Sequence, residues 1–540
     1  MLFHASLQHY RLFGVPAGAC AVMLLLGVHM AAQAQDAAPA GDDVRRVNIN
    51  EFIVRGNTVL DNKTIEAAVY PHMGPQRTLE DIEAARDALQ TVYHEHGYQS
   101  VYVDLPEQSV QGGVVILQVA ETRVGRLKVV GARHYSPLAI RDEVPALREG
   151  EVPDFNAAQA QLTELNQTAS RQVLPLVREG RIPGTMDVDL QVEDKRPWYV
   201  SAGLNNDYSA DTRKLRAVLS VGHDNLWQRG HSVSLSFFTA PQEISKLKVF
   251  SGSYSLPLSR DWSLQVAGYS SDSKVATVGG TNVLGKGHSF GVAATYTVPG
   301  QGDWHHSLGI GADYKDFDET VRFGNVDDTV PLTYVPITLS YNGYRYADSA
   351  QSTLGLSLVT ATRSMFGLNS DWRDFDYKRY LASPSFAVFK GDMTHNQGLG
   401  RDWQLYLRGS FQVASGALVS NEQFSAGGAN SVRGYLAAEA SADEGLLGSM
   451  ELRTPSLGAW LGNAVTDWRW HVFAEWAGLR LRDPLPEQQR IFHLGSVGLG
   501  TRMQVMDWLS ANLDWAYPLY AGSETRRYHP RLHFNLRANF

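Results

Sequence analysis

The alternation of apolar and polar residues in the last part of this 540-residue chain constrains its fold more than any other feature. Between residues 197 and 540, short segments alternate with a period of two, as at Leu532, Phe534 and Leu536. Successive side chains of a strand point to opposite faces, so this pattern predicts strands with one apolar and one polar face. We count about sixteen such segments, each long enough for a strand of ~10 residues and a turn.

Two regularities predict that these strands close into a membrane β-barrel. An Asp-Trp pair recurs where odd-numbered strands are predicted to begin, at residues 261, 303, 402, 467 and 507. Long loops also follow the odd strands, at residues 270–286, 316–332, 362–377, 415–445 and 478–491. A tryptophan girdle, long loops at one end only and a terminal aromatic residue, here Phe540, favour an outer-membrane barrel over a soluble β-sandwich or propeller.

The residues before 197 are built differently, because all twelve tryptophans lie at or after Trp198. Two successive α/β modules are predicted there, at residues 48–122 and 123–196. The first is expected to hold a strand at 49–54, a helix at 78–96 and strands at 101–105 and 114–119. The second is expected to hold a strand at 124–130, a helix at 156–170 and strands at 173–177 and 186–192.

The first 34 residues have the composition of a secretory signal peptide. They contain Arg11 and no acidic residue, an apolar run at 19–28, and Ala32-Gln33-Ala34 as a small-residue cleavage site. Residues 35–47 form a short segment before the first module. The single cysteine, Cys20, lies within the predicted signal peptide, so the exported chain is expected to form no disulfide bond.

Several functions are not expected. A net charge of −8 gives no basic surface for nucleic acid. Residues 287–291 match the G-x-S-x-G pattern of hydrolases, but Ser289 lies in a predicted strand and not at the required strand–turn–helix junction. His94-Glu95-His96 is read as a helix end because its imidazoles point to different sides. We therefore expect no catalytic residue, no metal site, no cofactor and no enzymatic activity.

Several motifs resemble those of one family of secretion proteins. Residues 424–435 read Phe-Ser-Ala-Gly-Gly-Ala-Asn-Ser-Val-Arg-Gly-Tyr, which resembles the GG-x-x-S-VRGY loop of the ShlB/FhaC/HecB-like (TpsB) transporters of two-partner secretion. Residues 448–455 and 513–519 resemble two later barrel strands of that family. Residues 96–98, 105–108, 113 and 119–121 resemble its first POTRA domain.

The resemblance implies two POTRA domains in the periplasm and a sixteen-stranded barrel in the outer membrane. The barrel would export one large partner protein, haemolysin-like or adhesin-like, that carries an N-terminal secretion domain. Periplasmic chaperones and the barrel-assembly machinery would insert the barrel into the outer membrane, where lipid surrounds it. An insertion factor for other barrels, from the same superfamily, is the alternative function. Family members often carry an N-terminal plug helix, for which residues 35–47 are too short, so the 415–445 loop alone is expected to close the pore.

The resemblance also implies a luminal loop motif and an anchoring strand. The motif consists of Gly427, Gly428, Val432, Arg433, Gly434 and Tyr435. In the family the arginine pairs with the carboxylate of an F-x-D-x-G strand. The matching residues here are Phe473, Glu475 and Ala477, so glutamate replaces aspartate and alanine replaces glycine. Alternation places Glu475 on the inward face, where it is expected to meet Arg433.

The secreted partner is expected to bind the α/β modules by adding a strand to an exposed sheet edge. Two edges are candidates, at residues 101–105 and 186–192. The candidate residues are Val101, Tyr102, Val103, Val188 and Leu190.

Overall fold

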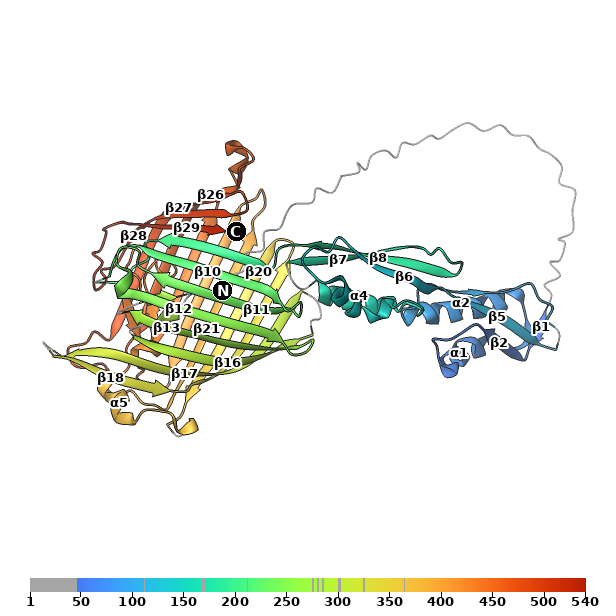
Figure 1. Cartoon of the computed structure of the whole chain (residues 1–540), viewed down its shortest axis with the longest axis horizontal. Helices are drawn as coiled ribbons and strands as arrows, with labels where there is room; N and C mark the ends of the chain where they lie inside the picture. The colour runs from blue at the N-terminus through green and yellow to red at the C-terminus, as the bar shows by residue number, and fades with distance from the viewer. Residues whose placement is uncertain are drawn as a thin grey trace, which may run out of the picture. The chain divides into compact units, whose positions relative to one another are not determined.

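The computed structural model describes residues 46–540 except 111, 167–169, 211, 274–275, 279–280, 284–285, 300–302, 324–325 and 364. The predicted signal peptide and nearly all of the 35–47 segment lie outside the described residues. The chain divides into two compact units, one ending at Arg196 and one running from Pro197 to Phe540 (Figure 1). Among the described residues, no helix has the length and apolar character needed to span a bilayer.

The first unit begins with a module of two helices and a three-stranded sheet. Its elements are β1 (Val47–Ile49), β2 (Glu51–Arg55), α1 (Asn62–Val69), β3 (Gly74–Arg77), α2 (Leu79–Glu95), β4 (Val101–Asp104) and β5 (Val114–Glu121). The sheet order is β2-β5-β4, and β1 pairs with β3. Thr78 caps α2 through a capping box with Asp81, which confirms the predicted helix start.

The second module repeats this plan. Its elements are β6 (Arg123–Val130), α3 (Pro137–Asp142), α4 (Phe155–Leu165), β7 (Arg171–Glu179) and β8 (Thr185–Asp194). The predicted helix at 156–170 ends early, because the Asn166 side chain bonds the backbone of Val173 in β7 and turns the chain. Burial opposes ionisation of Asp194, but the backbone N–H groups of residues 133–135 donate to its carboxylate and lower its pKa below 3.8.

One predicted sheet edge is wrong. The sheet order of the second module is β6-β8-β7, so β8 is the central strand and pairs on both sides. Val188 and Leu190 are fully buried in its core. The exposed edges are instead β6 and β7, whereas β4 is an edge in the first module as predicted.

The second unit is a closed antiparallel barrel. Its strands are β9 (Trp198–Asn205), β10 (Arg216–Leu226), β11 (His231–Thr239), β12 (Leu247–Pro257), β13 (Trp262–Ser273), β16 (Lys286–Val298), β17 (Trp304–Phe323), β18 (Val326–Tyr334), β19 (Ile337–Ala347), β20 (Ala350–Ala361), β21 (Phe386–Gly398), β22 (Gln404–Ala414), β25 (Glu444–Arg453), β26 (Val465–Arg480), β27 (Ile491–Val505), β28 (Leu509–Pro518) and β29 (Arg531–Asn539). Because β18 and β19 both pair with β17 and follow one another across Val335 and Pro336, they act as one strand, and the predicted count of sixteen is confirmed.

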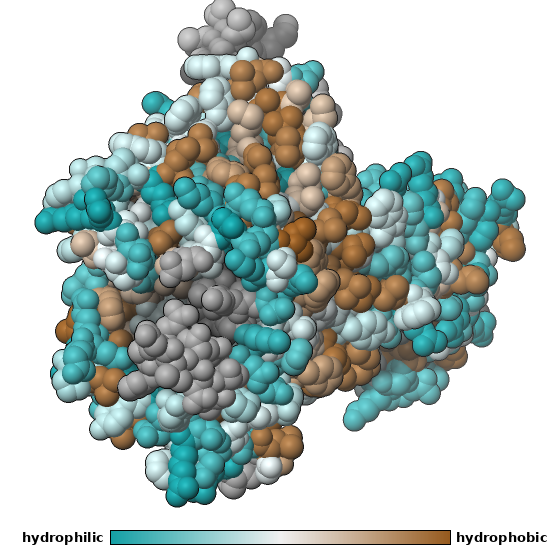
Figure 2. Space-filling model, turned by 60° about the vertical axis from the view of Figure 1, so that its left-hand side comes forward, coloured by the Kyte–Doolittle hydropathy of each residue, from teal (hydrophilic) through white to brown (hydrophobic). Residues whose placement is uncertain are grey.

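The outer face of the barrel is apolar. Along β26, Trp470, Val472 and Trp476 are exposed while His471, Phe473 and Glu475 are buried, as alternation predicts. Figure 2 shows patches of hydrophobic residues on the outer surface. We call the end at which β9 begins the near rim, where Trp262 and Trp304 open their strands, and the opposite end the far rim.

The far rim differs from the predicted loops in three places. Residues 316–332 are not a loop, because β17 and β18 continue as a hairpin. The predicted loop 270–286 contains a second hairpin, β14 (Ala276–Val278) with β15 (Thr281–Val283). The loop after β20 carries the helix α5 (Trp372–Lys378), which Asp371 caps through a capping box with Asp374.

Candidate functional site: the luminal loop

The segment 415–443, here called the luminal loop, connects β22 to β25 and packs against inward-facing barrel residues. Its arms are β23 (Phe424–Ala426) and β24 (Ala440–Ala442), which pair with each other. Its tip, residues 427–439, holds the predicted motif. The loop ends two residues earlier than predicted, because β25 begins at Glu444.

Arg433 lies at the centre of the tip and is 5% exposed. Its Nε and Nη2 donate to Glu475 Oε1 at 2.9 and 2.6 Å, and its backbone N–H donates to Oε2 at 2.6 Å. Its guanidinium also lies 3.5 Å from the centre of the Phe473 ring. One side chain of the tip is therefore held by two adjacent inward positions of β26, through charge-assisted hydrogen bonds and a cation–π contact.

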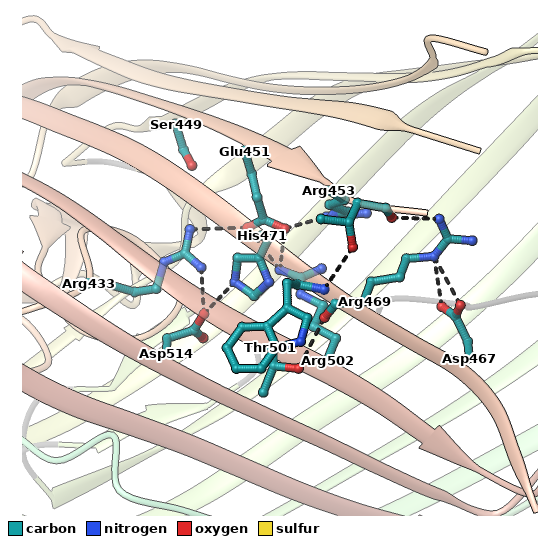
Figure 3. Close-up of polar contacts among 12 residues, drawn as sticks. Arg433, Ser449, Glu451, Arg453, Asp467, Arg469, His471, Thr501, Arg502 and Asp514 are labelled. Carbon is teal, nitrogen blue, oxygen red and sulfur yellow. Dashed lines mark hydrogen bonds and ion pairs between the residues drawn. The ribbon is translucent and has the colours of Figure 1, made fainter. Parts of the chain in front are cut away.

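Two further carboxylates complete this buried ionic cluster (Figure 3). Arg433 donates to Asp514 of β28 at 3.1 Å and to Glu451 of β25 at 3.2 Å. Glu451 also forms ion pairs with Arg453 at 2.7 Å and with Arg502 at 2.9 Å. Three guanidinium groups thus face three carboxylates, so the cluster is balanced in charge.

A histidine fixes the next residue of the tip. The Gly434 N–H donates to His533 Nε2 of β29 at 2.9 Å, so this ring nitrogen carries no proton. Gly434 has φ +95°, and a Cβ there would lie 3.3 Å from Ala516, which explains why a glycine stands at this turn. The tip is therefore in contact with β25, β26, β28 and β29.

Tyr435 and Val432 anchor the tip through apolar contacts. Both are fully buried, in a cluster that includes Ala477, Leu479 and Leu494. The Tyr435 hydroxyl lies 3.0 Å from the carbonyl of Gly495 and 2.9 Å from that of Tyr520. Ala477, where the family pattern has glycine, is accommodated within this apolar cluster.

The loop after β9 holds the other side of the tip. Asp207 accepts the N–H of Ala429 at 3.0 Å, and the Tyr208 carbonyl accepts the N–H of Ala437 at 3.0 Å. A Cβ on Gly428 would lie 2.6 Å from the Asp207 carboxylate, and one on Gly427 would lie 2.4 Å from the Leu436 carbonyl. Both glycines have positive φ, so the tip requires glycine at these two positions.

The base of the luminal loop carries a second buried carboxylate. Glu422, 2% exposed, accepts from Lys315 Nζ of β17 at 2.6 Å and from the Tyr334 hydroxyl of β18 at 2.8 Å. Lys390 of β21 lies 3.8 Å away. Leu418 and Val419 pack beside this site in an apolar core that includes Phe317 and Phe386.

That apolar core also includes Phe375 of α5 and Ala382, from the loop after β20. This differs from the expectation that the 415–445 loop alone closes the pore. The loop after β20 also occupies the far end of the barrel, because Phe375 of α5 packs onto the base of the luminal loop.

The structure brings together the predicted residues Arg433, Phe473 and Glu475, and it adds partners that the sequence reasoning missed. These are Glu451, Asp514, His533, Arg453 and Arg502. Each carboxylate and His533 lies between two apolar residues that face outward, such as Leu513 and Trp515 around Asp514. In a strand whose alternate residues face lipid, a charged residue at one of the intervening, inward-facing positions is the sequence signal that could have identified these partners.

The other predicted sites lie elsewhere. Phe540 exchanges backbone hydrogen bonds with Val200 of β9, at 2.8 and 3.1 Å, where the first and last strands meet. In β4, Tyr102 is 61% exposed, whereas Val101 and Val103 point into the module. Ser289 lies within β16, and His94 contacts the carbonyl of Val101. In the described part of the chain, no group of His, Cys, Asp and Glu is arranged to hold a metal ion.

Comparisons with known proteins found similar sequences and similar folds. Residues 184–472, more than half of the chain, match the family model described as haemolysin secretion/activation protein ShlB/FhaC/HecB. Residues 47–122 match the model of the ShlB-type POTRA domain. The outer membrane transporter CdiB of Dickeya dadantii is 25% identical over 179 residues, which are 33% of this chain and 31% of that protein. The match thus spans about a third of the length of this curated relative.

Solved structures share the fold. CdiB from Escherichia coli superposes with a TM-score of 0.64 at 18% identity and covers 94% of this chain and 93% of that one. BamA from Haemophilus ducreyi lacking POTRA domains 1–3 superposes with a TM-score of 0.54 at 15% identity and covers 92% of this chain and 100% of that one.

Proposed function

Because the chain belongs to the ShlB/FhaC/HecB family of haemolysin secretion/activation proteins, we propose that it exports one large secreted partner protein. In this family the barrel lies in the outer membrane and the POTRA modules lie in the periplasm, so the near rim faces the periplasm and the far rim the cell surface. The partner would be a haemolysin-like or adhesin-like exoprotein with an N-terminal secretion domain. Chaperones and the barrel-assembly machinery would deliver and insert the transporter itself.

The observation that carries this proposal is the buried ionic cluster around Arg433. Removing one partner of a buried ion pair costs about 3–5 kcal/mol, so a loop held in this way is a stable closure. Its three guanidinium groups pair with its three carboxylates, and His471 also contacts Asp514 at 2.6 Å, so the charges are matched within the chain. Such a closure suits a pore that opens only when a partner displaces the loop.

Partner capture would occur at the exposed edges of the two modules. An extended peptide can add a strand to β4, beside the exposed Tyr102, or to β7. On β7, Leu174, Leu176 and Val177 are 51%, 44% and 44% exposed, so both faces of that strand offer apolar contacts. This replaces β8 with β7 as the candidate edge of the second module.

The test is quantitative mass spectrometry of the culture supernatant and the outer membrane, with and without this gene in its native host. We expect one large protein to disappear from the supernatant and to return on complementation, with other barrels unchanged. Broad loss of outer-membrane barrels would instead establish an insertion factor. No change in either fraction, under conditions in which the chain is expressed, would refute the export function.

A further inference from the structure

The two sides of the barrel lumen differ in chemistry. The inward faces of β25–β29 carry the cluster of arginines, carboxylates and histidines described above. The middle of the inward faces of β10–β12, here called the serine wall, carries Ser220, Ser234, Ser236, Ser251, Ser253 and Ser255. Toward the far rim the same faces carry the buried apolar residues Phe238, Leu247 and Val249. The outward neighbours of the serines, such as Leu219, Leu235 and Phe250, are more than half exposed on the apolar outer face, which fixes the direction of the serines.

These serines stand in rows across the sheet. Ser220 pairs with Ser236, which pairs with Ser251, and the hydroxyls of the first two are 2.8 Å apart. The next row toward the near rim joins Ser234, Ser253 and Ala267. Between β10 and β12 both rows contain small uncharged side chains only, and Tyr269 of β13 extends the first row. The charged residues of the same face of β10, Arg216 and Asp224, lie nearer its two ends. The middle of this wall therefore offers hydroxyl groups and no fixed charge.

The small-residue surface continues beyond β13. One row runs from Gln265 through Ala293 and Gly311 to Thr338, across β13, β16, β17 and β19. Charged residues reappear at Asp313 of β17 and at Lys390 of β21. The uncharged surface therefore ends where the barrel wall meets the base of the luminal loop.

The serine rows also differ in burial from the ionic cluster on the charged side. On the charged side, inward residues are covered: Glu451 is 1% exposed, His471 2% and His533 1%. All six serines of the serine wall are partly exposed, although they too point inward. Because the luminal loop is anchored to the charged side, the water-accessible part of the lumen lies against the serine wall.

We propose that the serine wall is the path along which the secreted partner crosses the barrel as an extended polypeptide; this inference rests on the export function proposed above. A moving chain presents residues of both signs and many apolar side chains. Fixed charges would hold oppositely charged segments and repel others, and apolar patches would hold hydrophobic ones. Serine hydroxyls both donate and accept, so they exchange bonds with peptide groups and water with little preference for sequence.

The test uses single cysteines in the full-length chain, whose only thiol, Cys20, lies in the predicted signal peptide. Ser236→Cys and Ser253→Cys probe the serine wall. Asn512→Cys probes an inward, partly exposed position of β28 on the charged side, and Leu235→Cys probes the outer face. Each variant is treated with a bulky maleimide, and both labelling and secretion of the partner are measured.

We expect the serine-wall cysteines to label, and labelling to lower secretion about tenfold or more, which corresponds to an added barrier of ~1.4 kcal/mol. Labelled Asn512→Cys and Leu235→Cys should secrete as the unlabelled variants do. The proposal is overturned if the serine-wall cysteines resist labelling, or if labelled Asn512→Cys blocks secretion and labelled Ser253→Cys does not. If deletion of the gene alters no secreted protein, the export function itself fails, while labelling still reports which side of the lumen is open.

Discussion

The two ends of the luminal loop are held by opposite arrangements of charge. At the tip the loop supplies the cation, Arg433, and three barrel strands supply carboxylates. At the base the loop supplies the anion, Glu422, and β17 and β21 supply lysines. Arginine presents a planar fork that several carboxylates can share, whereas lysine is a compact point charge. The tip is therefore held by several directional bonds to one arginine. The base is held by the close ion pair of Glu422 with Lys315, by the buried carboxylate of Asp443 and by an apolar surround.

The largest effect is expected from Arg433→Ala, which removes the shared cation of the tip. Three carboxylates would remain with two arginines, so undocking of the tip should become easier by about 3–5 kcal/mol. The readout is the labelling rate of a cysteine introduced at Ala437, which is 4% exposed in the docked tip, and this rate should rise at least 100-fold. Arg408→Ala is the matched control, because Arg408 contacts the loop backbone at Asn430 outside the buried cluster. Equal rates in the two variants would contradict the ionic anchor.

A smaller effect is expected from Glu422→Gln at the base. The variant keeps the size of the side chain but removes the charge that Lys315 and Tyr334 bind, a loss of about 1.5–3 kcal/mol. A cysteine at Ala417, which is 3% exposed, should label faster while one at Ala437 keeps its rate. Glu243→Gln is the control, since Glu243 pairs with Arg213 and Lys246 in the loops at the ends of β10, β11 and β12, outside the luminal loop. If the labelling rates of both cysteines rose together, the tip and the base of the loop would be shown to undock as one unit.

Glu475→Asp tests how much the tip depends on the length of this side chain, because it introduces the shorter carboxylate of the family pattern. The two oxygens of Glu475 now reach the guanidinium and the backbone N–H of Arg433 together. Aspartate can keep one of these contacts, so undocking of the tip should become easier by about 1 kcal/mol. The labelling rate of a cysteine at Ala437 measures this change. A rate as high as that of Arg433→Ala would mean that Glu451 and Asp514 add nothing.

The smallest effect is expected from Lys390→Gln. Its Nζ lies 3.8 Å from Glu422 and its side chain is 36% exposed, so the pair is worth at most about 0.2–1 kcal/mol. Labelling at Ala417 should change by less than about fivefold. A change as large as that of Glu422→Gln would show that the base depends on both lysines equally.

The sequence was sufficient to predict the pairing of Arg433 with Glu475, but it did not predict the other partners of the tip. Parity within one strand placed Glu475 inside, and the loop motif supplied Arg433. The contributions of Glu451, Asp514 and His533 depend on which strands pair and in what register, and these pairings join residues far apart in the chain. The same limit explains the error at β8, because strand order cannot be read from the pattern of one strand. The helix α5 was missed because seven residues give too short a period to detect.

The hairpin of β17 and β18 gives the molecule a feature that other cells and antibodies would meet. β17 has 20 residues and at ~3.3 Å per residue is about 65 Å long, whereas the hydrocarbon core of a bilayer is about 30 Å thick. Even with a strong tilt, the far end of this strand stands clear of the lipid. This arm is therefore the part of the transporter best placed to serve as an epitope, a phage receptor or a site for a surface tag.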